Sequence, residues 1–82
     1  MVLSTDDPGK TWRTAVEVEL TRKTEARVVA ILRHLLAGYD DVVYRVAPSA
    51  ETVVRRAVRG LAHGAERIIV RPYPPESLAD VA

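Results

Sequence analysis

The order of the hydrophobic patterns along the chain restricts the fold more than any other feature of the sequence. Three short runs with strand character, residues 14–20, 42–47 and 67–71, are rich in β-branched side chains. Between them lie two segments with apolar residues at helical spacing, residues 25–37 and the stretch that begins at Pro48. Strand, helix, strand, helix, strand with short connections is typical of right-handed crossovers in a parallel sheet. The sequence therefore predicts an α/β fold with a three-stranded, mainly parallel βαβαβ sheet and two helices.

The alternation of side chains along the strands predicts that both helices cover one face of this sheet. Parallel strands that are covered on both faces are apolar throughout, but charged residues recur here at alternate positions. We assign to the helix-covered face Val16, Val18, Leu20, Val42, Tyr44, Val46, Ile68 and Val70. We assign to the opposite face Glu17, Glu19, Arg45, Arg67 and Arg71. This second face is expected to be polar, and either open or covered by another chain.

The residues beside the two helical segments predict where the helices begin and end. Thr21 or Thr24 can cap the first helix, and Gly38 can end it in a left-handed conformation. Ser49 is the expected cap of the second helix.

The chain of 82 residues is long enough for a single domain, which we place at residues 13–73. A turn sequence at 6–10 predicts that residues 1–12 form a turn or an extra hairpin strand, and the proline-rich residues 74–82 predict a flexible tail. The chain has no cysteine, no signal-peptide pattern and no apolar run of the ~18 residues that span a membrane. These features predict a cytoplasmic protein.

Charge is nearly balanced over the whole chain, with twelve basic and eleven acidic side chains and a formal net charge of +1. Binding to nucleic acid must therefore come from a local cluster. Arg55, Arg56 and Arg59 on the second helix are candidates for contacts with backbone phosphates, together with Arg22, Lys23, Arg27 and Arg33 on the first. The alternative is a solvated helix face.

Two carboxylates, Glu17 and Glu19, lie on the same side of the first predicted strand, and Lys23 follows them. Such a pair can hold a hard divalent ion such as Mg²⁺, while a lysine stabilises phosphate charge. Cleavage of a phosphodiester usually requires another carboxylate, for which Asp7 and its neighbour Asp6 are the upstream candidates. The alternative is a cross-strand network of salt bridges with the strand arginines.

One longer pattern resembles a known family. It consists of Trp12 to Lys23, centred on Val16-Glu17-Val18-Glu19-Leu20-Thr21-Arg22-Lys23, an arginine-containing helix, Tyr39-Asp40-Asp41-Val42-Val43-Tyr44 and a second helix. Over residues 12–71 it resembles the C-terminal half of the replication-relaxation proteins of actinobacterial plasmids and mobile elements. That family is similar to the PD-(D/E)xK nuclease-like superfamily, which includes restriction endonucleases.

The resemblance implies that Glu17 matches the strand acid of the nuclease motif, that Glu19 stands where a lysine is usual, and that Lys23 is a displaced lysine. It implies a metal-dependent nuclease if the protein is active, with Glu17, Glu19 and Asp7 as metal ligands. The chain departs from the pattern because it lacks the preceding helix and most of the preceding strands. We therefore expect a DNA-associated protein of plasmid replication or maintenance that is not an efficient enzyme alone. The alternative is a non-catalytic homo-oligomeric module that assembles through the polar sheet face or an edge strand.

Overall fold

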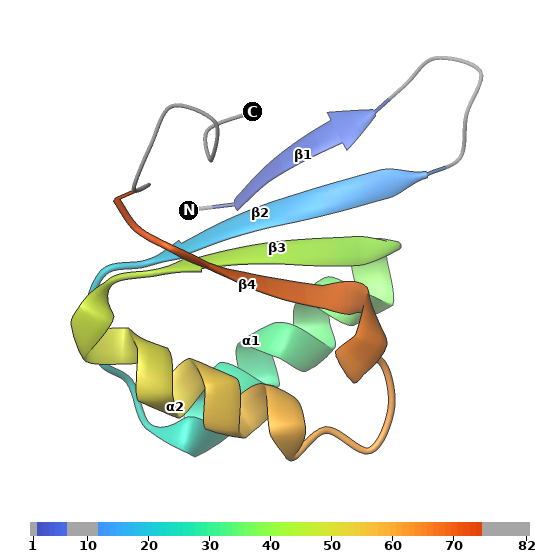
Figure 1. Cartoon of the computed structure of the whole chain (residues 1–82). Helices are drawn as coiled ribbons and strands as arrows, with labels where there is room; N and C mark the ends of the chain where they lie inside the picture. Colours follow the sequence, from blue (N-terminus) through green and yellow to red (C-terminus); the bar gives the residue numbers. More distant parts are fainter. Residues whose placement is uncertain (1, 7–11, 75–82) are drawn as a thin grey trace.

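The computed structural model describes residues 2–6 and 12–74 of the chain, and of residues 2–6 it describes only the backbone. The elements, in order, are β1 (Val2–Asp6), β2 (Arg13–Glu19), α1 (Glu25–Gly38), β3 (Asp41–Val46), α2 (Pro48–Arg59), the 3-10 helix η1 (Ala65–Arg67) and β4 (Ile68–Pro72). Both helices lie on the same side of the sheet, below it in Figure 1. This arrangement confirms the predicted two-layer α/β fold.

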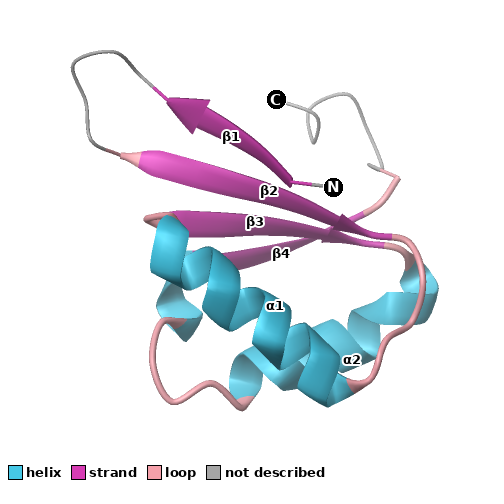
Figure 2. Cartoon of the chain, turned by 180° about the vertical axis from the view of Figure 1, so that it is seen from behind, coloured by secondary structure: helices cyan, strands magenta, loops and turns pink. Residues whose placement is uncertain are grey.

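The strands form one sheet in the order β1-β2-β3-β4. β2, β3 and β4 are parallel, and β1 pairs antiparallel with β2, so the predicted N-terminal hairpin strand is present. The two crossovers run through α1 and α2, which lie side by side beneath the sheet when it is viewed from behind (Figure 2). The expected tail lies almost entirely outside the described residues, which end at residue 74.

The hydrophobic core lies between the sheet and the two helices. Tyr44 is the largest of its fully buried side chains, and it occupies the centre of β3 with both helices beneath the sheet. The other core residues with 0% exposure come from both layers: Ala15, Val28, Leu32, Val42, Val54 and Ala57. Burial of these side chains stabilises the pairing of the helices with the sheet.

The prediction for the two faces of β2 was wrong. In the observed register Ala15 pairs with Val42 and Glu17 pairs with Tyr44, so the odd-numbered residues of β2 share the helix-covered face with the even-numbered residues of β3. Ala15 is 0% exposed and Glu19 is 3% exposed, whereas Leu20 lies beyond the end of the strand and is 57% exposed. Valines at alternate positions suggested the opposite orientation, but a buried carboxylate is tolerated when its oxygens have partners.

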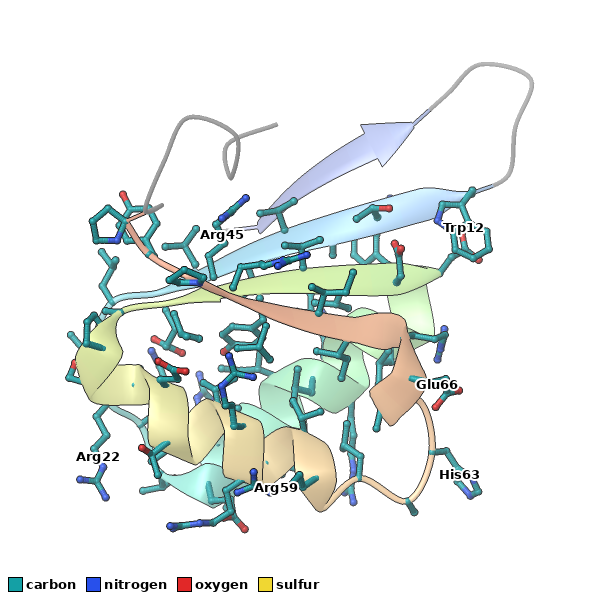
Figure 3. All side chains as sticks on the ribbon, in the orientation of Figure 1. Trp12, Arg22, Arg45, Arg59, His63 and Glu66 are labelled. Carbon is teal, nitrogen blue, oxygen red and sulfur yellow. The ribbon has the colours of Figure 1, made fainter. Side chains whose placement is uncertain are left out.

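The face of the sheet without helices is consequently apolar at its centre and charged at its ends. We call it the open face, and its described residues are Thr14, Val16 and Val18 of β2, Asp41, Val43 and Arg45 of β3, and Ile69 and Arg71 of β4. All of them are half-buried or exposed, and Figure 3 shows Arg45 on this side, away from the helices. The predicted polar face is therefore corrected: its acidic residues lie on the other side.

The two helices begin at adjacent loops near the C-terminal ends of β2 and β3. Thr24 caps α1 as predicted, because its hydroxyl accepts a hydrogen bond from the Arg27 backbone N–H at 3.2 Å. The cap of α2 is Ala47, two residues before the predicted Ser49, and it makes no side-chain hydrogen bond; Pro48 lies in the first turn. Proline fits the first turn because its missing N–H would have no partner there.

The C-terminal end of α1 is closed by a distant arginine rather than by a left-handed glycine. Gly64, in the loop before η1, is the glycine with positive φ (90°) among the described residues, and Gly38 keeps a right-handed backbone. Arg67, predicted on the polar sheet face, instead lies in η1 and donates hydrogen bonds to the carbonyl oxygens of Tyr39 and Asp40 at 3.2 Å. A cation is favourable at this position because the helix dipole is negative at its C-terminal end.

Candidate functional site

The carboxylates of β2 lie on the helix-covered face, where they meet different neighbours. Glu17 is half-buried and lines a pocket of about 320 Å³ together with Arg27 and His34 of α1. Glu19, two residues further along the strand, lies beside Lys23 and Tyr44. The structure thus brings Glu19 and Lys23 together, whereas Glu17 faces a separate pocket along α1.

Glu19 has a partner at each carboxylate oxygen. Tyr44 donates its hydroxyl proton to Oε1 at 3.1 Å, and the ammonium group of Lys23 donates to Oε2. The side chain of Glu19 is 4% exposed and that of Lys23 is 34% exposed, so the ion pair reaches from the core to the surface. Burial, followed by the negative charge of Glu19, raises the pKa of the Tyr44 hydroxyl well above its ordinary value.

Among the described residues, the structure does not bring three possible ligands of a Mg²⁺ ion together. Both oxygens of Glu19 already have hydrogen-bond partners, and no group of three or more His, Cys, Asp or Glu side chains gathers anywhere in residues 12–74. Asp6 pairs with Arg13, four residues before Glu17, which places its backbone roughly 13 Å away along the strand. Asp7, the predicted third ligand, lies outside the described residues. The Mg²⁺ site therefore stays a prediction from the sequence.

A second feature lies directly beyond the Glu19 pair, where the chain turns from β2 into α1. An open pocket of about 360 Å³ separates the first turn of α1 from α2. Its lining includes three cationic side chains, Arg22, Lys23 and Arg56, together with Thr24, Glu25 and Val53. The first turn of a helix adds the partial positive charge of its unpaired N–H groups. Three cations and a helix start around one opening favour an anion.

The basic residues continue along α2. Arg55 and Arg59 line a neighbouring pocket of about 180 Å³ with Val58, Ile68 and Val70. Figure 3 shows Arg22 and Arg59 on the helix side of the molecule, opposite to Arg45. We call Arg22, Lys23, Arg55, Arg56 and Arg59 the basic cluster.

The carboxylates beside the basic cluster leave its arginines accessible. Arg55 forms an ion pair with Glu51 at 2.8 Å, and Arg56 approaches Glu25 at 3.8 Å. The side chains in both pairs are 45% to 59% exposed. Exposed pairs of this kind contribute about 0–1 kcal/mol, so exchange of a carboxylate for a phosphate costs little.

The structure brings five of the predicted basic residues into the basic cluster and separates Arg27 from them. Arg27 lines the pocket beside Glu17 on the far flank of α1, because positions 25 and 27 of a helix differ by roughly 200° around its axis. Arg22 joins the basic cluster through the turn after β2, and Lys23 does so with its pairing to Glu19. Tyr44 was missed as the partner of Glu19; its one signal in the sequence is a tyrosine within a strand of valines.

No helix in the part of the chain that the structure describes is long and apolar enough to cross a membrane. Comparison with known proteins identifies no matching family model, no matching curated protein and no matching solved structure. The resemblance to replication-relaxation proteins therefore stays a prediction from the sequence pattern.

Proposed function

We propose that this protein associates with DNA by contacting backbone phosphates through the basic cluster. The observation that carries the proposal is the pocket at the start of α1, where Arg22, Lys23 and Arg56 surround one opening. Phosphate contacts by Arg and Lys provide most of the affinity of sequence-independent binding to DNA. The pattern that resembles plasmid replication-relaxation proteins supports plasmid replication or maintenance as the setting.

The distribution of charge supports a DNA-facing helix layer. Residues 20–38 and 47–60, which include both helices, carry seven basic and two acidic side chains, a net charge of +5, compared with +1 for the whole chain. A layer with this excess attracts a polyanion even though the complete protein is almost neutral.

The proposed role is binding rather than cleavage. Glu19 is engaged by Tyr44 and Lys23 inside the fold, where it supports the turn that carries Arg22 and Lys23. The Glu19 carboxylate therefore contributes to DNA binding indirectly, because it holds Lys23 at the edge of the pocket.

The test is the salt dependence of binding to a fluorescein-labelled 20-base-pair duplex, followed by fluorescence anisotropy. Three to five phosphate contacts predict a slope of log K against log salt of about −3 to −4.5 for the unaltered protein. The double variant R22A/R56A removes two cations from the pocket, so its slope should be shallower by about 1.8 and its binding weaker on every duplex sequence.

The control is R71A, which removes one positive charge from an exposed position on the open face, away from the helices. It should keep the affinity and slope of the unaltered protein. Equal binding by R22A/R56A and the unaltered protein would exclude the basic cluster as the contact surface.

A further inference from the structure

The open face is the largest feature that DNA binding leaves unexplained. Parallel strands are normally covered on both sides, but here both helices lie on one side. The side without helices carries Val16, Val18 and Val43, which are half-buried, and Ile69, which is 45% exposed. A contiguous apolar patch on a sheet is typical of an interaction surface.

The charges at the two ends of the open face have opposite sign. Along β3, side chains on this face are Asp41, Val43 and Arg45, in that order. Asp41 is half-buried and has no ion-pair partner among the described residues, and its Oδ1 atom is buried without a hydrogen-bond partner. Arg71 of β4 lies beside Arg45 in the register, so the positive end is wider than the negative end.

The apolar side chains cross the sheet in a straight row. Val16 pairs with Val43, and Val43 pairs with Ile69. A two-fold axis along this row would place each of the three side chains against its own copy. The same rotation reverses the strands, so Asp41 of one molecule lies opposite Arg45 of the other, and Arg45 lies opposite Asp41.

We propose that the open face binds the open face of a second copy of this chain, with the two-fold axis along Val16, Val43 and Ile69. Sheets packed face to face lie about 10 Å apart, with strand directions within about 30° of each other. An aspartate and an arginine side chain together can bridge that distance. A second copy fits this face because the charged and apolar side chains along β3 are self-complementary under that rotation. The helix layers, with their basic clusters, then face outward on opposite sides.

The test uses two charge reversals, D41R and R45D, in sedimentation velocity over about 2–500 μM, a range wide enough to detect dimers weaker than those of standard-size interfaces. The unaltered protein should form dimers as its concentration rises. Each variant alone should be monomeric because like charges meet at both contacts. An equimolar mixture of D41R and R45D should form dimers again, because the basic face of one meets the acidic face of the other.

The matched control is R33D, the same charge reversal on the exposed side of α1, which should leave dimers unaffected. Circular dichroism establishes that each variant is folded. If a charge reversal fails to fold, I69K replaces it, because this variant places a lysine on the axis at an exposed position and should abolish dimers. L20K, at an exposed position outside the open face, should not. A protein that stays monomeric at every concentration would overturn the proposal and leave the face to another occupant. A mixture of D41R and R45D that stays monomeric would overturn the two-fold arrangement.

Discussion

The buried Glu19 carboxylate is the residue on which the C-terminal end of β2 depends. Its two oxygens accept hydrogen bonds from Tyr44 and Lys23, so the negative charge is compensated inside the fold. A carboxylate without such partners would be strongly destabilising at 3% exposure. The pair holds Lys23 at the pocket of the basic cluster and so connects the core to the proposed binding surface.

Replacement of Tyr44 by phenylalanine should reveal this dependence. Y44F removes the donor to Glu19 Oε1 and leaves that buried oxygen unpaired, which should lower the free energy of unfolding by about 1–3 kcal/mol. Urea denaturation at pH 8 measures the loss. Y73F, at a more exposed tyrosine, is the control and should change stability by less than about 0.5 kcal/mol.

Y44F should also change how the free energy of unfolding depends on pH. Because the folded-state pKa of Tyr44 is raised, the folded protein holds this proton more tightly than the unfolded chain. Its contribution to stability is therefore complete below the unfolded pKa of 10.0 and declines as the pH rises further. The unaltered protein should lose more stability between pH 9 and pH 11 than Y44F does; equal losses would show that Tyr44 does not titrate in this way.

At the level of elements, the loop before η1 fixes how β4 joins the sheet. Gly64 adopts φ 90°, and an added Cβ would lie 2.8 Å from Leu36 Cδ1. This close approach lets the following residues of η1 bring Arg67 to the carbonyl oxygens at the end of α1. The loop therefore closes α1 and positions β4 at the same time.

Alanine at the two glycines should separate backbone strain from helix propensity. G64A combines positive φ with a steric contact, so we expect a loss of about 1–3 kcal/mol in the free energy of unfolding. G38A meets no atom within 4 Å and has a helical backbone, so it should be neutral or stabilising by up to about 1 kcal/mol. Thermal and urea unfolding of both variants test this difference, and equal effects would contradict the role given to Gly64.

The elements could be predicted from the sequence because their periodicities are distinct. The order of strands and helices, the hairpin strand and the Thr24 cap all follow from local patterns. The orientation of β2 could not, because Val16 and Val18 fit a core as well as Ala15 does, and only the register with β3 decides between them. The long-range contacts of Arg67 and Tyr44 were inaccessible for the same reason: each joins residues 25 or more positions apart.

The whole molecule has two proposed binding surfaces, which lie on opposite sides. The helix layer carries the basic cluster, and the open face carries the self-complementary pattern of apolar and charged residues. Of the predicted site, the sequence identified Arg55, Arg56 and Arg59 correctly as exposed residues of α2, while Arg27 lies on another flank. Arg22 and Lys23, predicted on the first helix, lie instead in the turn between β2 and α1, where Lys23 pairs with Glu19.

The most direct test of the central claim is a titration of the ¹⁵N-labelled protein with a 12-base-pair duplex, followed by amide chemical-shift changes. If the basic cluster binds phosphates, the largest changes should occur at Arg22, Lys23 and Arg56 and along the exposed side of α2. The amides of Val16, Val43 and Ile69 on the open face should change little. Largest changes on the open face, or no changes at low salt, would contradict the account.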